Sequence, residues 1–394
     1  MSTAARSIIL LTLAEVLAMS LWFISGALLP EMQAEAPMSA GHAAAMATAV
    51  QAGFVLGALG LALHGTSDRH DPRLIFAASA LLAAASSAGM VLLSPDNGAQ
   101  IALRMITGMA LAGVYPVGMR IAVSWTARRR GAVVGLLIAA LTLGAAAPHL
   151  FALAPGQGWR GPVLLAAGLS AGAAVLMAGV RLGPFHRRAT GMSVRAVGLA
   201  WTDRRLRLAF AGYLGHMWEL YAFWAWIATA LSLSFTAMAP DEAIRTARLT
   251  AFAAISAGAL SCLLAGPVAD RLGKARVARW ALLGSLSGAV ITAASFGGPP
   301  ALTIAGALLW GATIIPDSGQ FSALVADHAP EDRAGSLLTL QTALGFLLSA
   351  LTVQGLPFVA GGLGWPLALA LLAPGPLLGA EAMRRLMRME GRAT

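Results

Sequence analysis

Long apolar runs and short polar turns alternate along the whole chain. Each run has about 20 residues, enough for a helix to cross roughly 30 Å of hydrocarbon. Twelve runs can be counted, at about 8–30, 44–63, 74–94, 99–122, 131–153, 161–181, 208–232, 248–268, 277–296, 301–322, 334–356 and 364–383. The pattern predicts an all-α membrane protein with twelve transmembrane helices. Because Glu15 interrupts the first run and eleven more follow, we interpret that run as a helix and not as a cleaved signal peptide.

The second half of the chain repeats features of the first about 200 residues later. The matched pairs are Asp68 and Asp270, Pro116 and Pro316, and Gly144 and Gly345. We therefore expect two pseudo-symmetric six-helix halves, 1–181 and 208–394, joined by a cytoplasmic linker over 182–207. The linker is rich in arginine, and we prefer a solvated segment lying on anionic lipid to a regulatory site.

Composition and charge agree with a membrane protein. Of 394 residues, 58% are hydrophobic and only 11% are charged, whereas about a quarter of a soluble domain is charged. The formal net charge is +10, but all 27 basic residues except Arg104, Arg160, Arg245 and Arg248 lie on one side of the predicted topology. This is the positive-inside bias, so we expect a bacterial-type cytoplasmic (inner) membrane protein with both termini cytoplasmic and no nucleic-acid partner.

The sequence contains few features that would indicate an enzyme or a bound cofactor. Cys262 is the single cysteine, which leaves no disulfide framework and no cysteine metal site. The predicted loops are too short for a catalytic domain and contain no phosphate-binding glycine loop. We expect no enzyme activity, no metal and no cofactor, and uphill transport would have to use an ion gradient.

A polar turn, GPVADRLGKAR, carries the most specific motif. Its spaced residues are Gly266, Asp270, Arg271, Gly273, Lys274 and Arg276, and a weaker copy earlier in the chain keeps Asp68 and Arg69. The spacing resembles the cytoplasmic loop signature of the major facilitator superfamily, a family of twelve-helix secondary transporters. The resemblance implies alternating access, with the substrate bound between the halves and these eight residues acting as a gating latch.

The fourth predicted helix contains a second, shorter resemblance. Arg104 and Gly108 match the Arg-x-x-x-Gly of that family's fourth helix, where the arginine points into the cavity. A planar guanidinium suits a carboxylate or another oxyanion, and the alternative is an arginine that extends toward the outer surface. The fifth helix has Gly135, Gly144 and Pro148 but lacks the pattern of proton antiporters, so antiport lacks its usual signature and symport remains open.

Few ionisable side chains lie inside the predicted spans, and these are the candidates for proton coupling. An ionisable group in hydrocarbon costs at least about 2.5 kcal/mol, so such groups usually face a cavity and have partners. We predict coupling roles for Glu15, His216, Glu219 and Asp317. The alternatives are that His216 and Glu219 only satisfy each other, that Glu15 has a permanent structural partner, and that Asp317 serves gating.

Candidate substrate contacts follow from the same helices. Trp218 and Tyr221 flank Glu219, and Gln320 lies one turn after Asp317. Together with Arg104 they form the predicted substrate site, although aromatic residues in spans more often serve packing.

These observations lead to one expected function and two alternatives. We expect a monomeric, proton-coupled transporter of a small solute, with an organic anion as the substrate class. One alternative is a proton-antiport exporter of drugs or metabolites. The other, of a different class, is a transport-inactive sensor or an uncoupled facilitator.

Overall fold

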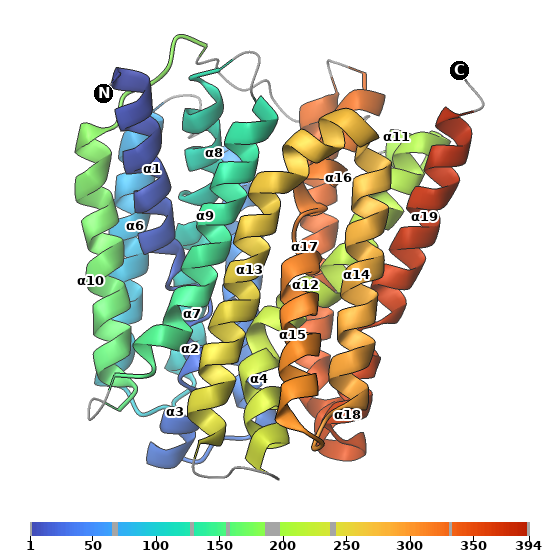
Figure 1. Cartoon of the computed structure of the whole chain (residues 1–394). Helices are drawn as coiled ribbons and strands as arrows, with labels where there is room; N and C mark the ends of the chain where they lie inside the picture. Colours follow the sequence, from blue (N-terminus) through green and yellow to red (C-terminus); the bar gives the residue numbers. More distant parts are fainter. Residues whose placement is uncertain are drawn as a thin grey trace. The chain divides into compact units, whose positions relative to one another are not determined.

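The computed structural model describes residues 2–64, 70–126, 130–154, 158–185, 198–236, 242–330 and 333–391. Every regular element in these residues is a helix (Figure 1). A helix satisfies its own backbone hydrogen bonds, as an apolar surrounding requires. The chain divides into two compact units, Met1–Ala189 with Arg245–Phe252, and Thr190–Ile244 with Ala253–Thr394.

The first unit begins with α1 and ends with the segment after α10. Its elements are α1 (Thr3–Met19), α2 (Ile24–Ala27), α3 (Leu29–Glu35), α4 (Ala40–Leu63), α6 (Pro72–Gly89), η1 (Met90–Leu92), α7 (Ala99–Leu111), α8 (Tyr115–Val123), α9 (Arg130–Phe151), α10 (Arg160–Leu176) and η2 (Met177–Gly179). Residues 112–114 separate α7 from α8 within one apolar segment.

The second unit contains the longest helices. Its elements are α11 (Leu199–Thr202), α12 (Arg204–Thr236), α13 (Ala243–Leu272), α14 (Lys274–Ala294), α15 (Pro300–Ile314), α16 (Ser318–His328), α17 (Ala334–Leu363), α18 (Trp365–Ala370) and α19 (Pro374–Glu390). The first turns of α13 group with the first unit. There Arg248 donates hydrogen bonds to the carboxylate of Glu31 and to the carbonyl oxygens of Ala27 and Ala152.

Ten segments of the described residues are long and apolar enough to cross a membrane. They correspond to ten of the twelve predicted runs, and the two remaining runs are 8–30 and 208–232. The first is divided between α1, which has 17 residues, and shorter helices. The second lies in α12, a helix of 33 residues whose apolar character is diluted by His216, Glu219 and several aromatic side chains.

The predicted first span, 8–30, is not one continuous helix. α1 ends at Met19, and the next turns are closed by hydrogen bonds from Leu21 N–H to the Ala18 carbonyl and from Trp22 N–H to the Met19 carbonyl, at 3.3 and 3.0 Å. These bonds join residues three apart, in place of the four-residue spacing of an α-helix. An apolar sequence conceals such a break, because the residues on both sides of it remain hydrophobic.

The predicted polar turn at 266–276 is much shorter in the structure. α13 continues through Pro267 to Leu272, and α14 begins at Lys274. Gly273 alone separates the two helices, with a φ of 92°. Glycine adopts this conformation without the steric cost that a Cβ would bring, so one residue is sufficient for the turn.

Small residues allow α4 and α7 to cross at close range. A Cβ built on Gly57 of α4 would lie 2.3 Å from the carbonyl oxygen of Met109, and one on Gly108 of α7 would lie 2.0 Å from that of Val50. The two backbones therefore touch where glycine supplies the room, as is common between helices in membranes.

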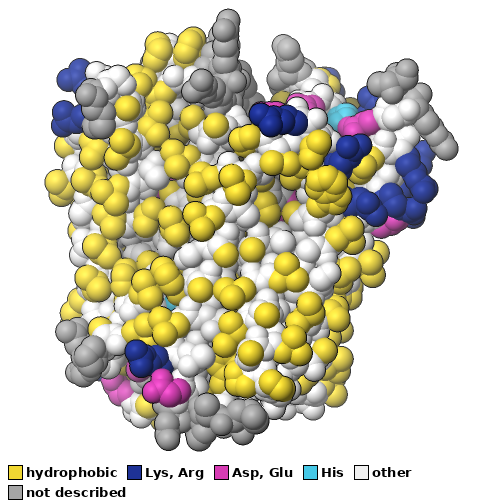
Figure 2. Space-filling model, viewed as in Figure 1, with side chains coloured by type: hydrophobic (Ala, Val, Ile, Leu, Met, Phe, Trp, Pro, Cys, Tyr) yellow, Lys and Arg dark blue, Asp and Glu magenta, His cyan; other side chains and the backbone are white. Residues whose placement is uncertain are grey.

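Hydrophobic side chains cover much of the face drawn in Figure 2, and charged side chains gather toward the helix ends. Many leucines are exposed on this protein, among them Leu92 at 84% and Leu264 at 68%. Exposed apolar side chains along long helices are stable in contact with lipid tails, which agrees with a multi-pass membrane protein.

Candidate functional site

Glu15 lies about one turn before the end of α1 and is fully buried. Among the residues that the structure describes, neither carboxyl oxygen has a hydrogen-bond partner. The carboxyl group packs against Gly118 of α8, where a Cβ would lie 3.0 Å from Oε2 and 3.4 Å from the ring of Phe76. A buried carboxyl group without donors is stable only when it is protonated or when a partner arrives.

Arg104 projects from α7 to the break that follows α1. Its Nη1 donates to the carbonyl oxygen of Leu21 at 2.8 Å, and its Nη2 donates to that of Trp22. The side chain is fully buried, and its Nε has no partner among the described residues. Arg104 thus donates to two backbone oxygens of the break between α1 and α2.

Glu219 of α12 is a fully buried carboxylate held by two donors. Oε1 accepts a hydrogen bond from Ser285 Oγ of α14 at 2.6 Å, and Oε2 accepts one from Trp310 Nε1 of α15 at 2.7 Å. The ring of Trp310 also packs against Phe223, one turn after Glu219, with centroids 4.8 Å apart. A single acid therefore joins three helices of the second unit.

His216, one turn before Glu219, contacts a different acid. Its Nδ1 lies 2.9 Å from Oδ1 of Asp317, and both side chains are buried. Asp317 occupies the break between α15 and α16, directly after Pro316. The rings of Tyr213 and Phe321 lie 6.2 and 5.8 Å from the imidazole ring. The pair is ionic whenever His216 is protonated.

Equivalent elements of the two units carry these groups. Glu15 contacts α8 just beyond Pro116, and His216 contacts the start of α16 just beyond Pro316. A lone carboxyl group beside glycine in the first unit therefore corresponds to a histidine–aspartate pair in the second.

The predicted aromatic contacts do not gather around Glu219. Trp218 donates from Nε1 to the carbonyl oxygen of Leu371 at 2.9 Å, on the side of α19. The ring of Tyr221 packs against Phe346 of α17, with centroids 5.0 Å apart. Neighbouring residues on a helix point about 100° apart, so residues that flank Glu219 in sequence face other helices. Their role in binding substrate stays a prediction.

Gln320 lies on the first turn of α16 and is 7% exposed. Its backbone N–H donates to the carbonyl oxygen of Asp317 at 2.9 Å, which closes the turn after the break. Gln320 and Asp317 are therefore held together by local structure.

Within the second unit, a lysine of the loop motif makes an ion pair. Lys274 Nζ lies 2.5 Å from Oδ2 of Asp327, near the end of α16. Asp270, Arg271 and Arg276 are exposed. The earlier copy of the motif, Asp68 and Arg69, lies outside the described residues, so the predicted latch of eight residues remains a prediction.

Ser285 and Trp310 were missed by reasoning from the sequence. An inventory of ionisable residues overlooks neutral donors, yet these two satisfy Glu219. A serine and a tryptophan in the middle of apolar runs were the available signal, because a buried indole N–H needs an acceptor. Among the described residues, no group of three His, Cys, Asp or Glu side chains could hold a metal ion.

Comparison with protein families gives a match over most of the chain. The model of the family described as Major Facilitator Superfamily matches residues 11–353. No curated protein sequence matches this one.

Among solved structures, the chain is similar to the partially occluded, inward-open xylose transporter XylE from E. coli, with a TM-score of 0.75 and 15% identity over 98% of each chain. It is also similar to a D-xylose–proton symporter, with a TM-score of 0.78 and 14% identity over 97% of each chain. The nucleoside transporter NupG gives a TM-score of 0.73 and 14% identity over 98% of this chain and 99% of that one. At these identities the structures establish a common fold.

Proposed function

Because the chain belongs to the major facilitator superfamily, we propose that it is a secondary active transporter that moves a small solute across the cytoplasmic membrane by proton-coupled alternating access. The observation that carries the proposal is a group of buried acids in the spans, Glu15, Glu219 and Asp317, together with His216, the partner of Asp317. Keeping four such groups in apolar helices is costly, and a coupling role explains why the chain has them. The similarity to a proton symporter supports the same mechanism.

The buried groups differ in how well their surroundings suit reversible protonation during transport. Glu219 accepts a hydrogen bond on each carboxyl oxygen, from Ser285 and Trp310, and these bonds join three helices. Asp317 has a basic partner that can itself gain or lose a proton, and Glu15 has no partner among the described residues. We therefore assign proton loading to Glu15 and to the His216–Asp317 pair, and a supporting role to Glu219.

Proteoliposomes with a pH-sensitive dye inside test this assignment. Asp317→Asn and Glu15→Gln are expected to abolish solute-driven proton movement while solute exchange without a gradient continues. Asp96→Asn, in an exposed loop, is the matched control and keeps both activities. Proton movement at the wild-type rate in both coupling variants would overturn the assignment.

An organic anion remains the substrate class that we propose, because Arg104 places a guanidinium group inside the fourth span. The two terminal nitrogens of Arg104 already donate to the carbonyl oxygens of Leu21 and Trp22. This observation favours the second candidate function, the export of solutes whose binding does not require an arginine.

Thermal unfolding against a panel of carboxylates, sugars, nucleosides and cationic drugs separates the two candidates. A ligand at a hundred times its dissociation constant adds about 2.7 kcal/mol to the stability of the folded state. Hits among carboxylates that disappear in Arg104→Lys, which keeps the charge but loses the planar fork, support the anion carrier. Hits confined to cationic or apolar compounds, unchanged in the variant, favour the exporter. A protein that binds a solute but moves neither solute nor protons would be a sensor.

A further inference from the structure

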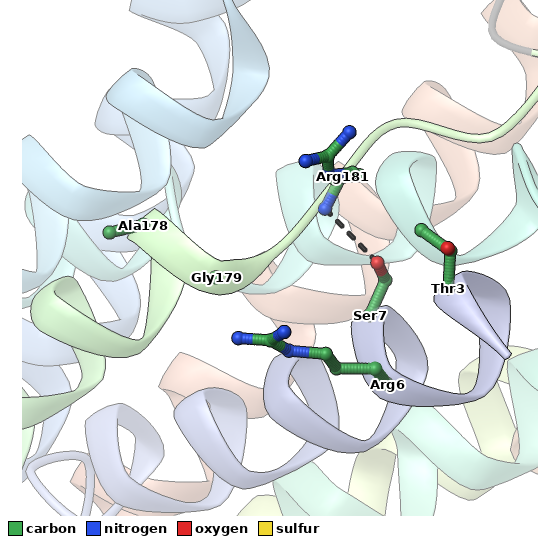
Figure 3. A pocket seen from close by; sticks show the side chains of 6 residues that line it. All are labelled: Thr3, Arg6, Ser7, Ala178, Gly179 and Arg181. Carbon is green, nitrogen blue, oxygen red and sulfur yellow. Dashed lines mark hydrogen bonds between the residues drawn. The ribbon is translucent and has the colours of Figure 1, made fainter. Parts of the chain in front are cut away.

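A polar cavity of about 350 Å³ lies at the start of α1, far along the helix from Glu15. Figure 3 shows its lining, which comes from the first turns of α1 and from the segment that follows α10. The lining residues are Thr3, Arg6, Ser7, Ala178, Gly179 and Arg181. The cavity belongs entirely to the first unit.

The two sides of this cavity are joined by a hydrogen bond and by a close approach. The backbone N–H of Arg181 donates to Ser7 Oγ at 3.1 Å. A Cβ on Gly179 would lie 2.8 Å from the Leu10 side chain and 3.8 Å from Nη2 of Arg6. The absence of a side chain at Gly179 therefore leaves room for the Leu10 side chain, and the Arg6 guanidinium lies within contact distance of the same glycine.

Among the described residues that line the cavity, positive charge is in excess. Within the part of the chain that the structure describes, neither the Arg6 nor the Arg181 guanidinium has a hydrogen-bond or ion-pair partner, and none of the six lining residues is acidic. The nearby Arg73 is already paired with Asp71. Two free guanidinium groups beside the hydroxyl groups of Thr3 and Ser7 offer the donors that a phosphate group binds.

Apolar surface leads away from the cavity along both helices. Ile9 and Leu13 are 54% and 45% exposed, and they follow Arg6 by three and seven residues, on one face of α1. Val175 is 73% exposed and lies one turn before Gly179 on α10. The apolar segment that contains α10 ends at Gly179, so the cavity lies at one end of that segment.

We propose that this cavity binds the phosphate of an anionic phospholipid, with Arg6 and Arg181 on the phosphate and the acyl chains along Ile9, Leu13 and Val175. Free phosphate offers the same oxygen chemistry without the chains. The apolar surface beside the cavity favours the lipid, because it gives the chains a place to lie.

The test compares the purified full-length protein with a double variant, Arg6→Gln with Arg181→Gln. The control, Arg205→Gln with Arg388→Gln, removes the same charge from exposed positions of the second unit. Native mass spectrometry and thermal unfolding are measured with phosphatidylglycerol, with phosphatidylcholine and with inorganic phosphate. Because each guanidinium attracts anionic lipid, we expect the double variant to bind phosphatidylglycerol about tenfold or more weakly than wild type.

Each outcome decides the proposal. Binding of phosphatidylglycerol that weakens in the double variant and not in the control supports a lipid site. Stabilisation by inorganic phosphate alone, lost in the same variant, supports a phosphate site that takes the free ion. Equal binding by wild type and the double variant, or equal losses in the variant and its control, overturns the proposal.

Discussion

Inside the spans, the burial of an acidic side chain depends on neutral hydrogen-bond donors. Burial of Glu219 is stabilised by Ser285 and Trp310, which donate hydrogen bonds to its two carboxyl oxygens. Leaving a buried polar oxygen without its donor costs about 1–3 kcal/mol.

Trp310→Phe keeps the ring and removes the N–H that Glu219 accepts. We expect it to destabilise the protein by about 1–3 kcal/mol, measured as a lower Tm in detergent. The control is Trp280→Phe on α14, whose ring is 51% exposed and whose substitution should change Tm little. A Trp310→Phe protein as stable as wild type would mean that the hydrogen bond contributes nothing.

Glu35 gives a prediction outside the spans. The hydrogen bond from the Arg160 guanidinium is the main cause that holds the pKa of Glu35 below its usual value, and the Trp159 N–H, 2.8 Å from Oε2, adds to it. A lowered pKa in the folded state stabilises the protein above the usual carboxyl pKa of about 4.3, and this contribution disappears as the pH falls through the folded value.

Thermal unfolding of wild type and Glu35→Gln should therefore differ at pH 6 and converge below pH 4. Both side chains are about 40% exposed, so solvent limits the difference to about 1 kcal/mol at most. A difference that grows at low pH would contradict the sign of the effect.

The sequence was sufficient to select Glu15, His216, Glu219 and Asp317 as unusual, because hydropathy marks any ionisable residue in a span. It was not sufficient to pair them. Ser285 and Trp310 are 66 and 91 residues from Glu219, and which side chains meet depends on the rotation of each packed helix. Neighbours in sequence, such as Trp218, mislead for the same reason.

At the scale of elements, α4 and α7 depend on glycine at their crossing. Gly57 and Gly60 both lie on α4, but a Cβ on Gly57 meets the backbone of Met109, whereas one on Gly60 meets nothing within 4 Å.

Gly57→Ala should separate the two helices and destabilise the protein by about 1–3 kcal/mol, in line with other overpacking substitutions. Gly60→Ala is the matched control and should be neutral or stabilising by up to about 1 kcal/mol, because alanine favours the helix. Thermal unfolding and the monodisperse yield of the two variants measure the difference. Equal behaviour would mean that the crossing tolerates a wider spacing.

The apolar runs were sufficient to predict that helices form, but they were not sufficient to predict where a helix is interrupted. The break after Met19 and the single-residue turn at Gly273 both contradict the expected boundaries. A hydropathy profile averages over about 20 residues, and it contains no information about which backbone groups form hydrogen bonds.

At the scale of the whole molecule, the arginine distribution makes the orientation in the membrane testable. Asn97 and Thr202 are exposed, and the positive-inside bias assigns them to opposite sides. The native Cys262 is buried and is replaced by alanine in the background.

A membrane-impermeant maleimide should label Asn97→Cys in intact cells, and it should label Thr202→Cys only after the cells are opened. The unlabelled cysteine-free background is the control. Labelling of Thr202→Cys in intact cells would reverse the orientation and assign the 182–207 linker to the outside.

The Arg104 contacts also have a consequence for synthesis of the chain. Leu21 and Trp22 emerge from the ribosome about 80 residues before Arg104, so their carbonyl oxygens enter the membrane before their donor exists. We expect the first span to stay in contact with the insertion machinery, or with water, until the fourth span arrives. Arg104 would then set the moment at which the amino-terminal helices are released into lipid.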